Sequence, residues 1–169
     1  MSIKRVYAEI DLSAIQSNME HMNAMIDKHT KIIAVIKADG YGHGALQIAQ
    51  KFECSEYVFG YATATVEEAV DLRENNIKKP ILILGYTFPE DYESIIKYEI
   101  SPAVFKAETA RQLSACAEKM HKKVHVHIKV ETGMSRIGVS PDDRGLSVVK
   151  EIAACPWIEV EGMFTHFAR

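Results

Sequence analysis

A chain of 169 residues with a formal net charge of -3 has room for one domain with a substantial hydrophobic core. Its 20 basic and 23 acidic residues are well mixed and include only short Lys-Lys pairs, which argues against a nucleic-acid-binding surface. No apolar run could span a bilayer or act as a signal peptide, so a membrane protein is not expected, and three widely spaced cysteines favour reduced thiols in the cytoplasm over disulfides or a zinc site.

The first predicted elements are a helix and a strand. Asp11 can cap a helix whose apolar stripe has helical spacing, namely Ile15, Met19, Met22 and Ile26. A strand is expected at residues 31–37, because the run Ile32–Ile36 is continuously apolar and is typical of a strand buried on both faces.

Lys37 stands at the end of that apolar run and is followed by Gly40, Gly42 and Gly44. An ammonium group in such a place is costly unless it is paired, neutral or covalently occupied. Lys37 is therefore a candidate for chemistry, although strand-end lysines that simply reach solvent are also common.

Strands and helices alternate along the rest of the chain. Further strands are expected at 57–61, 80–84, 100–104, 123–130 and 158–164. Helices are expected around 46–52, from Thr65 onward, and at 89–98, 107–120 and 142–154. Thr65 and Glu68 have the spacing of a capping box.

This alternation is typical of an α/β protein with a parallel sheet. Six strands would complete a doubly wound open sheet, whereas a (β/α)8 TIM barrel needs eight strands and typically about 250 residues. Periodicity does not decide between the two. The printed chain stops at residues 165–169, just past a strand and where a crossover helix should begin, so we interpret it as a truncated portion of a larger fold.

Polar residues that could take part in binding or catalysis follow several of the predicted strands. Lys37 follows the first strand, Arg136 lies in the loop after the fifth, and His166 follows the sixth. In both architectures the carboxyl ends of the strands meet at one edge, so a lysine, an arginine and a histidine could converge on a small anionic or aldehyde-bearing ligand. Strand ends are also where polar residues reach solvent, and that alternative stays open.

The strand His125-Val126-His127-Ile128-Lys129 places both histidines and Lys129 on one face. Lys129 would need a carboxylate partner, or could react with carbon dioxide to form a carbamate. His-x-His is also a metal-ligand pattern, which raises a rival hypothesis, a metal-dependent amidohydrolase. Only His166 offers an obvious further ligand, so partly buried histidines with satisfied hydrogen bonds are the preferred interpretation and no metal is expected.

Three segments, AVIKADGYGHGA, VETGMSRIG and GMFTHFAR, together resemble the bacterial alanine racemase family, pyridoxal-phosphate enzymes of fold type III. The segments RVYAEIDLSAIQSN and ILILGYT fit as well, so the resemblance covers essentially the whole chain. It implies a homodimer whose subunits have an N-terminal (β/α)8 barrel and a C-terminal β-domain. Residues 1–169 would form about six strands of that barrel, and the β-domain would be absent from this chain.

The resemblance also implies roles for six residues. Lys37 would bond to the aldehyde of pyridoxal 5'-phosphate and act as a base on one face of the substrate. Arg136 would bind the phenolic oxygen of the cofactor and lie near the substrate carboxylate. The other four would be Tyr41 at the cofactor phosphate, Leu84 in the apolar wall, His166 against the pyridine ring, and Lys129 as a possible carbamylated lysine.

Two positions depart from the family pattern, because Glu131 and Ser135 stand where aspartate and glycine are frequent. The implied reaction is the interconversion of L-alanine and D-alanine for peptidoglycan precursors, with serine as an alternative substrate. A non-catalytic pyridoxal-phosphate carrier barrel is a further alternative. We expect residues 1–169 alone to be inactive, since the family's base on the opposite face is a tyrosine that would lie outside them.

Overall fold

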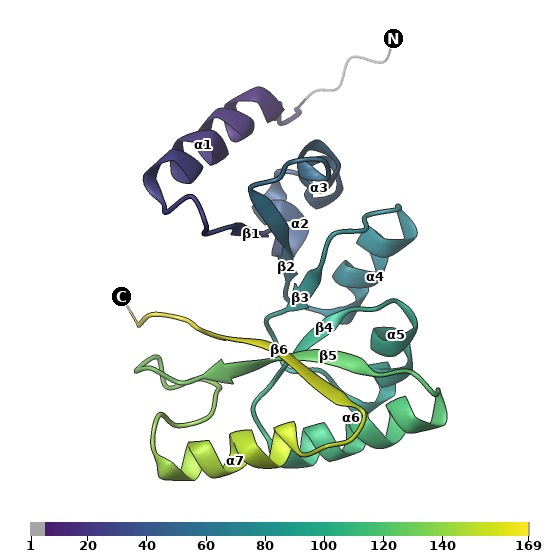
Figure 1. Ribbon diagram of the computed structural model, residues 1–169. Coiled ribbons are helices and arrows are strands. Elements are labelled where there is room, and N and C mark those ends of the chain that lie inside the picture. Colours follow the sequence, from purple (N-terminus) through teal and green to yellow (C-terminus); the bar gives the residue numbers. More distant parts are fainter. Residues whose placement is uncertain (1–5, 169) are drawn as a thin grey trace.

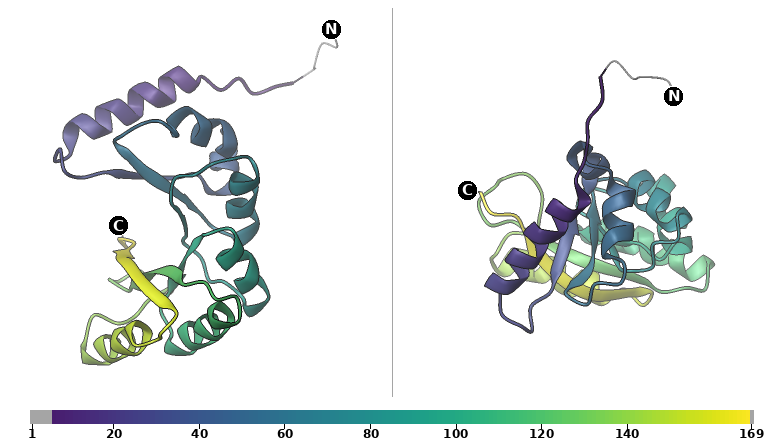
Figure 2. Two further views of the ribbon diagram at one scale, coloured as in Figure 1. Left: turned by 45° about the vertical axis from the view of Figure 1, so that its right-hand side comes forward. Right: turned by 90° about the horizontal axis from the view of Figure 1, so that it is seen from above.

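The computed structural model describes residues 6–168, which form a strongly curved parallel sheet with helices on its outer side (Figures 1 and 2). The strands are β1 (Ile32–Val35), β2 (Val58–Thr63), β3 (Ile81–Ile83), β4 (Ser101–Val104), β5 (Val124–Val130) and β6 (Ile158–Thr165). They are neighbours in chain order, and each is parallel to the next. A doubly wound sheet reverses its strand order at a switch point. The sequential order therefore confirms the predicted portion of a (β/α)8 barrel.

Helices connect the strands along the convex side of the sheet (Figure 2). The structure has α1 (Leu12–Met25) before β1, then α2 (Lys37–Gly42), α3 (Ala45–Phe52), α4 (Val66–Glu74), the 3-10 turn η1 (Pro89–Asp91), α5 (Tyr92–Lys97), α6 (Ala107–Lys119) and α7 (Asp143–Ala153). No helix within residues 6–168 combines the length and the apolar character that crossing a membrane requires.

The hydrophobic core lies between the convex face of the sheet and these helices. Strand residues Ile81 and Ile83 are almost fully buried against helix residues such as Phe52, Leu72 and Leu113. The apolar positions of each helix recur on its inner side, as the 3.6-residue period requires. This packing holds the strands in place and so determines where their carboxyl ends lie.

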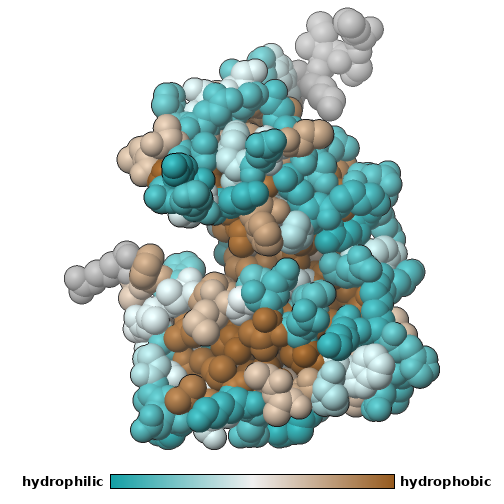
Figure 3. Space-filling view, viewed as in Figure 1, coloured by the Kyte–Doolittle hydropathy of each residue, from teal (hydrophilic) through white to brown (hydrophobic). Residues whose placement is uncertain are grey.

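Strand β1 differs from its prediction. It is shorter than residues 31–37, and Lys37 belongs to the following turn. It is also not buried on both faces, because the side chains of Ile33 and Val35 are 36% and 44% exposed. The physical reason is that β1 is an edge strand whose concave side faces the open interior. Figure 3 shows apolar side chains at the surface across the middle and lower part of the face viewed.

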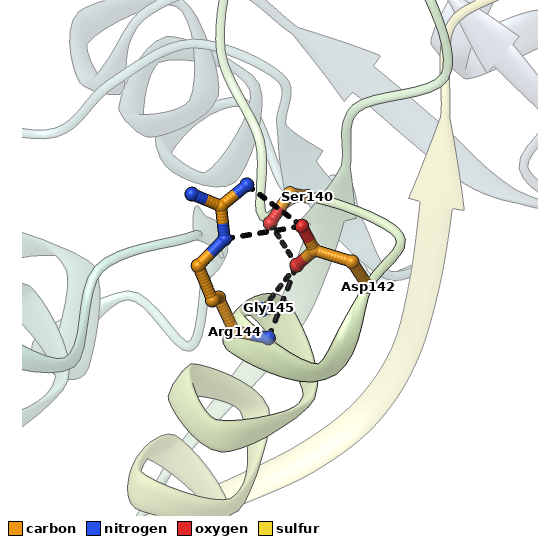
Figure 4. A network of polar contacts seen from close by, with 4 residues as sticks. All are labelled: Ser140, Asp142, Arg144 and Gly145. Atoms are coloured by element: carbon orange, nitrogen blue, oxygen red, sulfur yellow. Dashed lines mark hydrogen bonds and ion pairs between the residues drawn. The ribbon is translucent and has the colours of Figure 1, made fainter.

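The predicted start of the helix near residue 142 is confirmed in atomic detail (Figure 4). The Asp142 carboxylate accepts hydrogen bonds from the backbone N–H groups of Arg144 and Gly145 and from the Ser140 hydroxyl, at 3.1, 3.0 and 2.6 Å. The Ser140 hydroxyl first, then the Gly145 N–H and the Arg144 guanidinium, which also donates to this carboxylate, hold the pKa of the Asp142 carboxyl well below its usual range. Asp11 caps α1 in the same way, with Oδ1 2.8 Å from the Ser13 nitrogen.

The predicted capping box at the start of α4 is only half present. The Thr65 hydroxyl accepts from the Glu68 backbone N–H at 3.4 Å, as expected. The Glu68 carboxylate, however, accepts from the backbone N–H groups of Ala64 and Ala38. The Glu68 side chain therefore points away from its own helix and connects the backbone just after β1 with the backbone just after β2.

Candidate active site

Residues in or just after β1, β2, β3, β5 and β6 line a cavity of about 260 Å³ on the concave side of the sheet. It is lined by Lys37, Leu84, Lys129, Arg136 and His166, with walls from Ile33, Val35, Ala62, Leu82, Phe164 and Thr165. Five of the six residues identified from the sequence therefore meet in one place. The sixth, Tyr41, lies beside the cavity, with its ring centroid 5.9 Å from the Lys37 Nζ atom.

Lys37 opens a left-handed turn. The next four residues, from Ala38 to Tyr41, have φ between 51° and 61° and ψ between 36° and 50°. Three of these residues are not glycine, and each L-residue in this region costs roughly 1–2 kcal/mol. The turn leaves the Lys37 side chain half-buried in the cavity and the Tyr41 side chain 61% exposed.

Hydrogen bonds hold this strained turn at both ends. At its start, the Ala38 N–H donates to Glu68 Oε1 at 2.7 Å. At its end, the Asp39 carboxylate accepts from the Ala45 N–H at 2.8 Å and so also begins α3. The three glycines after Lys37 all have positive φ, between 61° and 88°, which explains their spacing without any ligand.

Lys129 is buried in the cavity wall, with 2% of its surface exposed. Its Nζ donates to the Val130 carbonyl at 2.6 Å and lies 5.6 Å from the centroid of the Phe164 ring. Burial lowers the pKa of the Lys129 ammonium, nearby Glu131 opposes that shift, and nearby Arg136 adds to it. The environment therefore favours the neutral amine more than water does.

Arg136 is carried by a loop that Glu131 closes. The Glu131 carboxylate accepts from the backbone N–H groups of Gly133 and Arg136, the latter at 3.2 Å. Backbone hydrogen bonds also join Val139 to Lys129 and to Glu131, at 2.9 and 2.8 Å. The exposed Arg136 guanidinium thus projects into the cavity from a compact loop.

Leu84 and His166 complete the cavity from β3 and β6. Leu84 directly follows β3 and is half-buried. His166 directly follows β6 and is exposed, with Nδ1 2.7 Å from the Phe167 carbonyl oxygen. The neighbouring Thr165 hydroxyl donates to the Val130 carbonyl at 3.0 Å, which ties the ends of β5 and β6 together.

The two histidines of β5 are separated from this cavity. His127 Nε2 lies 3.2 Å from Glu161 Oε2, which also accepts from the Ser101 hydroxyl at 3.1 Å, deeper on the concave side. His125 is exposed near the opposite end of the sheet. In the part of the chain that the structure describes, no three or more His, Cys, Asp or Glu side chains are grouped so that they could hold a metal ion. The amidohydrolase hypothesis therefore finds no ligand set among these residues.

Sequence reasoning missed the two carboxylates that shape the rim, Glu68 and Glu131. The spacing of Thr65 and Glu68 indicated a local cap, and nothing in the sequence pointed from Glu68 to Ala38. Glu131 was noted as a departure from a family pattern, and nothing in the sequence indicated that its carboxylate would accept from the Gly133 and Arg136 N–H groups.

Comparison with known proteins identifies the family. A family model described as the N-terminal domain of alanine racemase matches residues 10–169. An alanine racemase from Clostridium novyi is 42% identical over 167 residues, which are 98% of this chain and 42% of that protein. The chain thus spans about 42% of the length of such curated relatives.

Solved structures agree with the sequence match. The alanine racemase of Clostridium difficile 630 in complex with cycloserine superposes with a TM-score of 0.91 at 39% identity, over 95% of this chain and 44% of that one. A histidine racemase from Leuconostoc mesenteroides superposes with a TM-score of 0.85 at 25% identity, over 94% of this chain and 42% of that one. With the sheet order and the rim geometry, these matches show that the chain belongs to the alanine racemase N-terminal domain family.

Proposed function

We propose that this chain is the lysine-bearing part of a pyridoxal-phosphate-dependent racemase that interconverts L-alanine and D-alanine. The observation that carries the proposal is the convergence of Lys37, Arg136, Lys129, Leu84 and His166 on one cavity. Membership of the family and the relatives named alanine racemase support the choice of reaction. The remaining domain of the proposed enzyme, a C-terminal β-domain, would lie outside residues 1–169.

The chemistry of the cavity fits pyridoxal 5'-phosphate. A flat aromatic ring with an aldehyde, an acidic oxygen and a phosphate needs an amine, a cation and apolar walls. The cavity offers the Lys37 amine, the Arg136 guanidinium and the side chains of Val35, Leu82 and Leu84. When bound, this cofactor supplies an electron-accepting ring that makes the α-proton of an amino acid removable.

Each protein group then has a distinct task. Lys37 would hold the cofactor aldehyde and carry a proton at Nζ, for which its amine must be free of other partners. Arg136 would bind an acidic oxygen of the cofactor and orient the substrate carboxylate. His166 would pack against the ring, and Tyr41, which stands beside the cavity, would reach the phosphate. A second acid–base group on the opposite face would come from outside residues 1–169.

Lys129 has a supporting role in this proposal, as a carbamylated lysine. Its neutral amine would add to carbon dioxide, forming one N–C bond and releasing one proton. The lowered pKa of its ammonium supports the reaction, since only the neutral amine is nucleophilic. The resulting negative charge would face the Arg136 guanidinium, which lines the same cavity.

Alanine is the proposed substrate because the relatives at this level of identity are named alanine racemases. The histidine racemase with the same fold indicates that this portion of the barrel is compatible with other amino acids. Serine is therefore the alternative substrate to test. We further propose a cytoplasmic homodimer that supplies D-alanine to peptidoglycan. The family resemblance supports the homodimer, and the buried Cys155 thiol, which donates to the Glu151 carbonyl at 3.5 Å, suits a reducing compartment.

The test is borohydride reduction of the full-length protein with pyridoxal phosphate, followed by peptide mass spectrometry and a D-alanine assay. A pyridoxyl group on Lys37 and formation of D-alanine from L-alanine are the expected results. Lys37→Arg should abolish both, whereas Lys31→Arg, at the other end of the same strand region, should retain both. A full-length protein without the adduct on Lys37 would contradict the proposal.

A further inference from the structure

We propose that Glu68 is the positioning residue for Lys37, acting through the backbone of the left-handed turn; this inference rests on the proposed role of Lys37. The Glu68 carboxylate is the direct side-chain link between α4 and that turn. Glu68 Oε1 accepts from the Ala38 N–H at 2.7 Å, and Ala38 is bonded to Lys37 itself. Glu68 Oε2 accepts from the Ala64 N–H at 2.8 Å, at the end of β2.

Those two hydrogen bonds connect neighbouring strands where the cavity begins. β1 and β2 pair in parallel up to Val35 and Ala62, and the Ile36 N–H donates to the Ala62 carbonyl at 2.9 Å. Beyond that point the two backbones separate, Lys37 into its turn and Ala64 toward α4. Beyond the hydrogen bond between Ile36 and Ala62, the Glu68 carboxylate connects the two backbones through Ala38 and Ala64.

An ionised carboxylate suits this position better than an amide does. Two backbone N–H groups need two acceptor oxygens, and ionised glutamate has both. Glutamine has one acceptor oxygen, and its NH₂ group would face one of the donors. Alanine removes both acceptors and one first-turn charge, but it keeps a strong helix former in α4.

The strain in the turn explains why such a link is needed. Ala38, Asp39 and Tyr41 are L-residues in a left-handed conformation that the chain leaves readily when nothing holds it. The Asp39 carboxylate secures the far end of the turn at Ala45. Glu68 secures the near end, next to Lys37, where a displacement of about 1 Å can cost on the order of a hundredfold in rate.

Glu67 offers a matched control on the same helix turn. Its carboxylate is exposed, and its own backbone N–H and the nearby Thr65 hydroxyl lower its pKa. A Glu67→Ala variant therefore removes an equal charge near the start of α4, together with its local capping contacts. It leaves the Ala38 and Ala64 hydrogen bonds in place.

Two measurements on the full-length protein test the inference. The first is amide hydrogen exchange without cofactor, resolved at Ala38 and Ala64. Glu68→Ala should accelerate exchange about tenfold or more at both amides, and Glu68→Gln at one of them at least, because a hydrogen bond to a charged acceptor is lost. The second is the rate at which pyridoxal phosphate and borohydride label Lys37, which should fall about tenfold or more in Glu68→Ala. Glu67→Ala should stay within about twofold of the parent in both.

Exchange at both amides within about twofold of the parent, in either folded Glu68 variant, would overturn the inference. Faster exchange with unchanged labelling of Lys37 would overturn it as well, because the link would then be structural alone. If Glu68→Ala does not fold, Glu68→Gln decides, with labelling expected between that of the parent and that of the Lys37→Arg variant. Absence of labelling in the parent would refute the proposed function, while the exchange data would still decide whether Glu68 holds the turn.

Discussion

Replacing Arg73 should destabilise the protein more than replacing an exposed charged residue does. The Arg73 guanidinium, on the last turn of α4, donates to four backbone carbonyls. They belong to Ile77 and Lys79, at 2.8 and 2.7 Å, and to Tyr98 and Glu99, both at 3.0 Å. One side chain thus joins the connection into β3 with the connection into β4. Burial lowers the pKa of the guanidinium, and the charges of Glu99 and Glu53 oppose that shift.

The magnitude follows from the number and burial of these bonds. Three of the four reach half-buried atoms, and the fourth is exposed. A hydrogen bond to a charged group contributes roughly 1.5–3 kcal/mol, and carbonyls left without donors recover only part of this from water. We therefore expect Arg73→Ala to lower the free energy of unfolding by about 3–5 kcal/mol, out of a typical total of about 5–15. Arg73→Lys should lower the free energy of unfolding by about 2–3 kcal/mol, because a single ammonium group replaces a planar guanidinium whose N–H donors point in several directions.

Urea unfolding of the full-length protein, followed by circular dichroism, measures this difference. Arg111→Ala is the matched control, since Arg111 forms a 3.0 Å ion pair with Glu151 in which both side chains are more than half exposed. Such a pair contributes less than about 1 kcal/mol. If Arg73→Ala cost no more than Arg111→Ala, the idea that this side chain fixes the connections into β3 and β4 would be wrong.

Three further outcomes are expected at the cavity. Glu131→Gln should speed amide exchange at Gly133 and Arg136 with little change in the rest of the sheet, since it loses one acceptor oxygen; unchanged exchange would show that the backbone alone holds the loop. The pKa of Lys129 is lower in the folded protein than its ordinary value of 10.5. At a pH between these two pKa values, the unfolded chain binds more protons than the folded one, so the contribution of Lys129 to stability rises with pH. In carbon dioxide-free buffer the unfolding free energy of the parent should accordingly increase relative to that of Lys129→Met as the pH rises toward 10.5. Addition of ¹³C-bicarbonate should give a carbamate NMR signal in the parent and none in Lys129→Met.

The sheet was largely predictable because each strand carries a continuous or alternating apolar pattern bounded by turn residues. The expected strand at 123–130 differs from β5 by a single residue, and the expected start of α7 agrees with its Asp142 cap. The order of the strands did not follow from the alternation of elements, because two architectures share that alternation; the prediction of a barrel came from the family resemblance. That choice depends on which strands pair, and pairing is a long-range property of the packed chain.

The cavity residues were identified partly by position and partly by resemblance. Lys37, Arg136 and His166 follow strands, and a parallel sheet gathers such positions at one rim. The side chains that hold the rim were missed for a physical reason. Glu68 reaches across 30 residues to Ala38, and no local period encodes that contact. Away from the rim, the contact between Glu161 and His127 lies at an irregularity in the pairing of β5 with β6, where simple alternation fails.

The rim repeats one physical arrangement at Lys37 and at Arg136. Each of these side chains is carried by a turn with left-handed residues, and each turn is held by a carboxylate that accepts backbone N–H groups. Such turns are strained by themselves, so the carboxylates hold the two side chains at defined places beside a rigid sheet. Glu68 and Glu131 are engaged by backbone N–H groups, so their negative charges stabilise the turns. The Lys37 amine and the Arg136 guanidinium thus stay available in the cavity, the amine for the aldehyde of the proposed cofactor and the guanidinium for the acidic groups of cofactor and substrate.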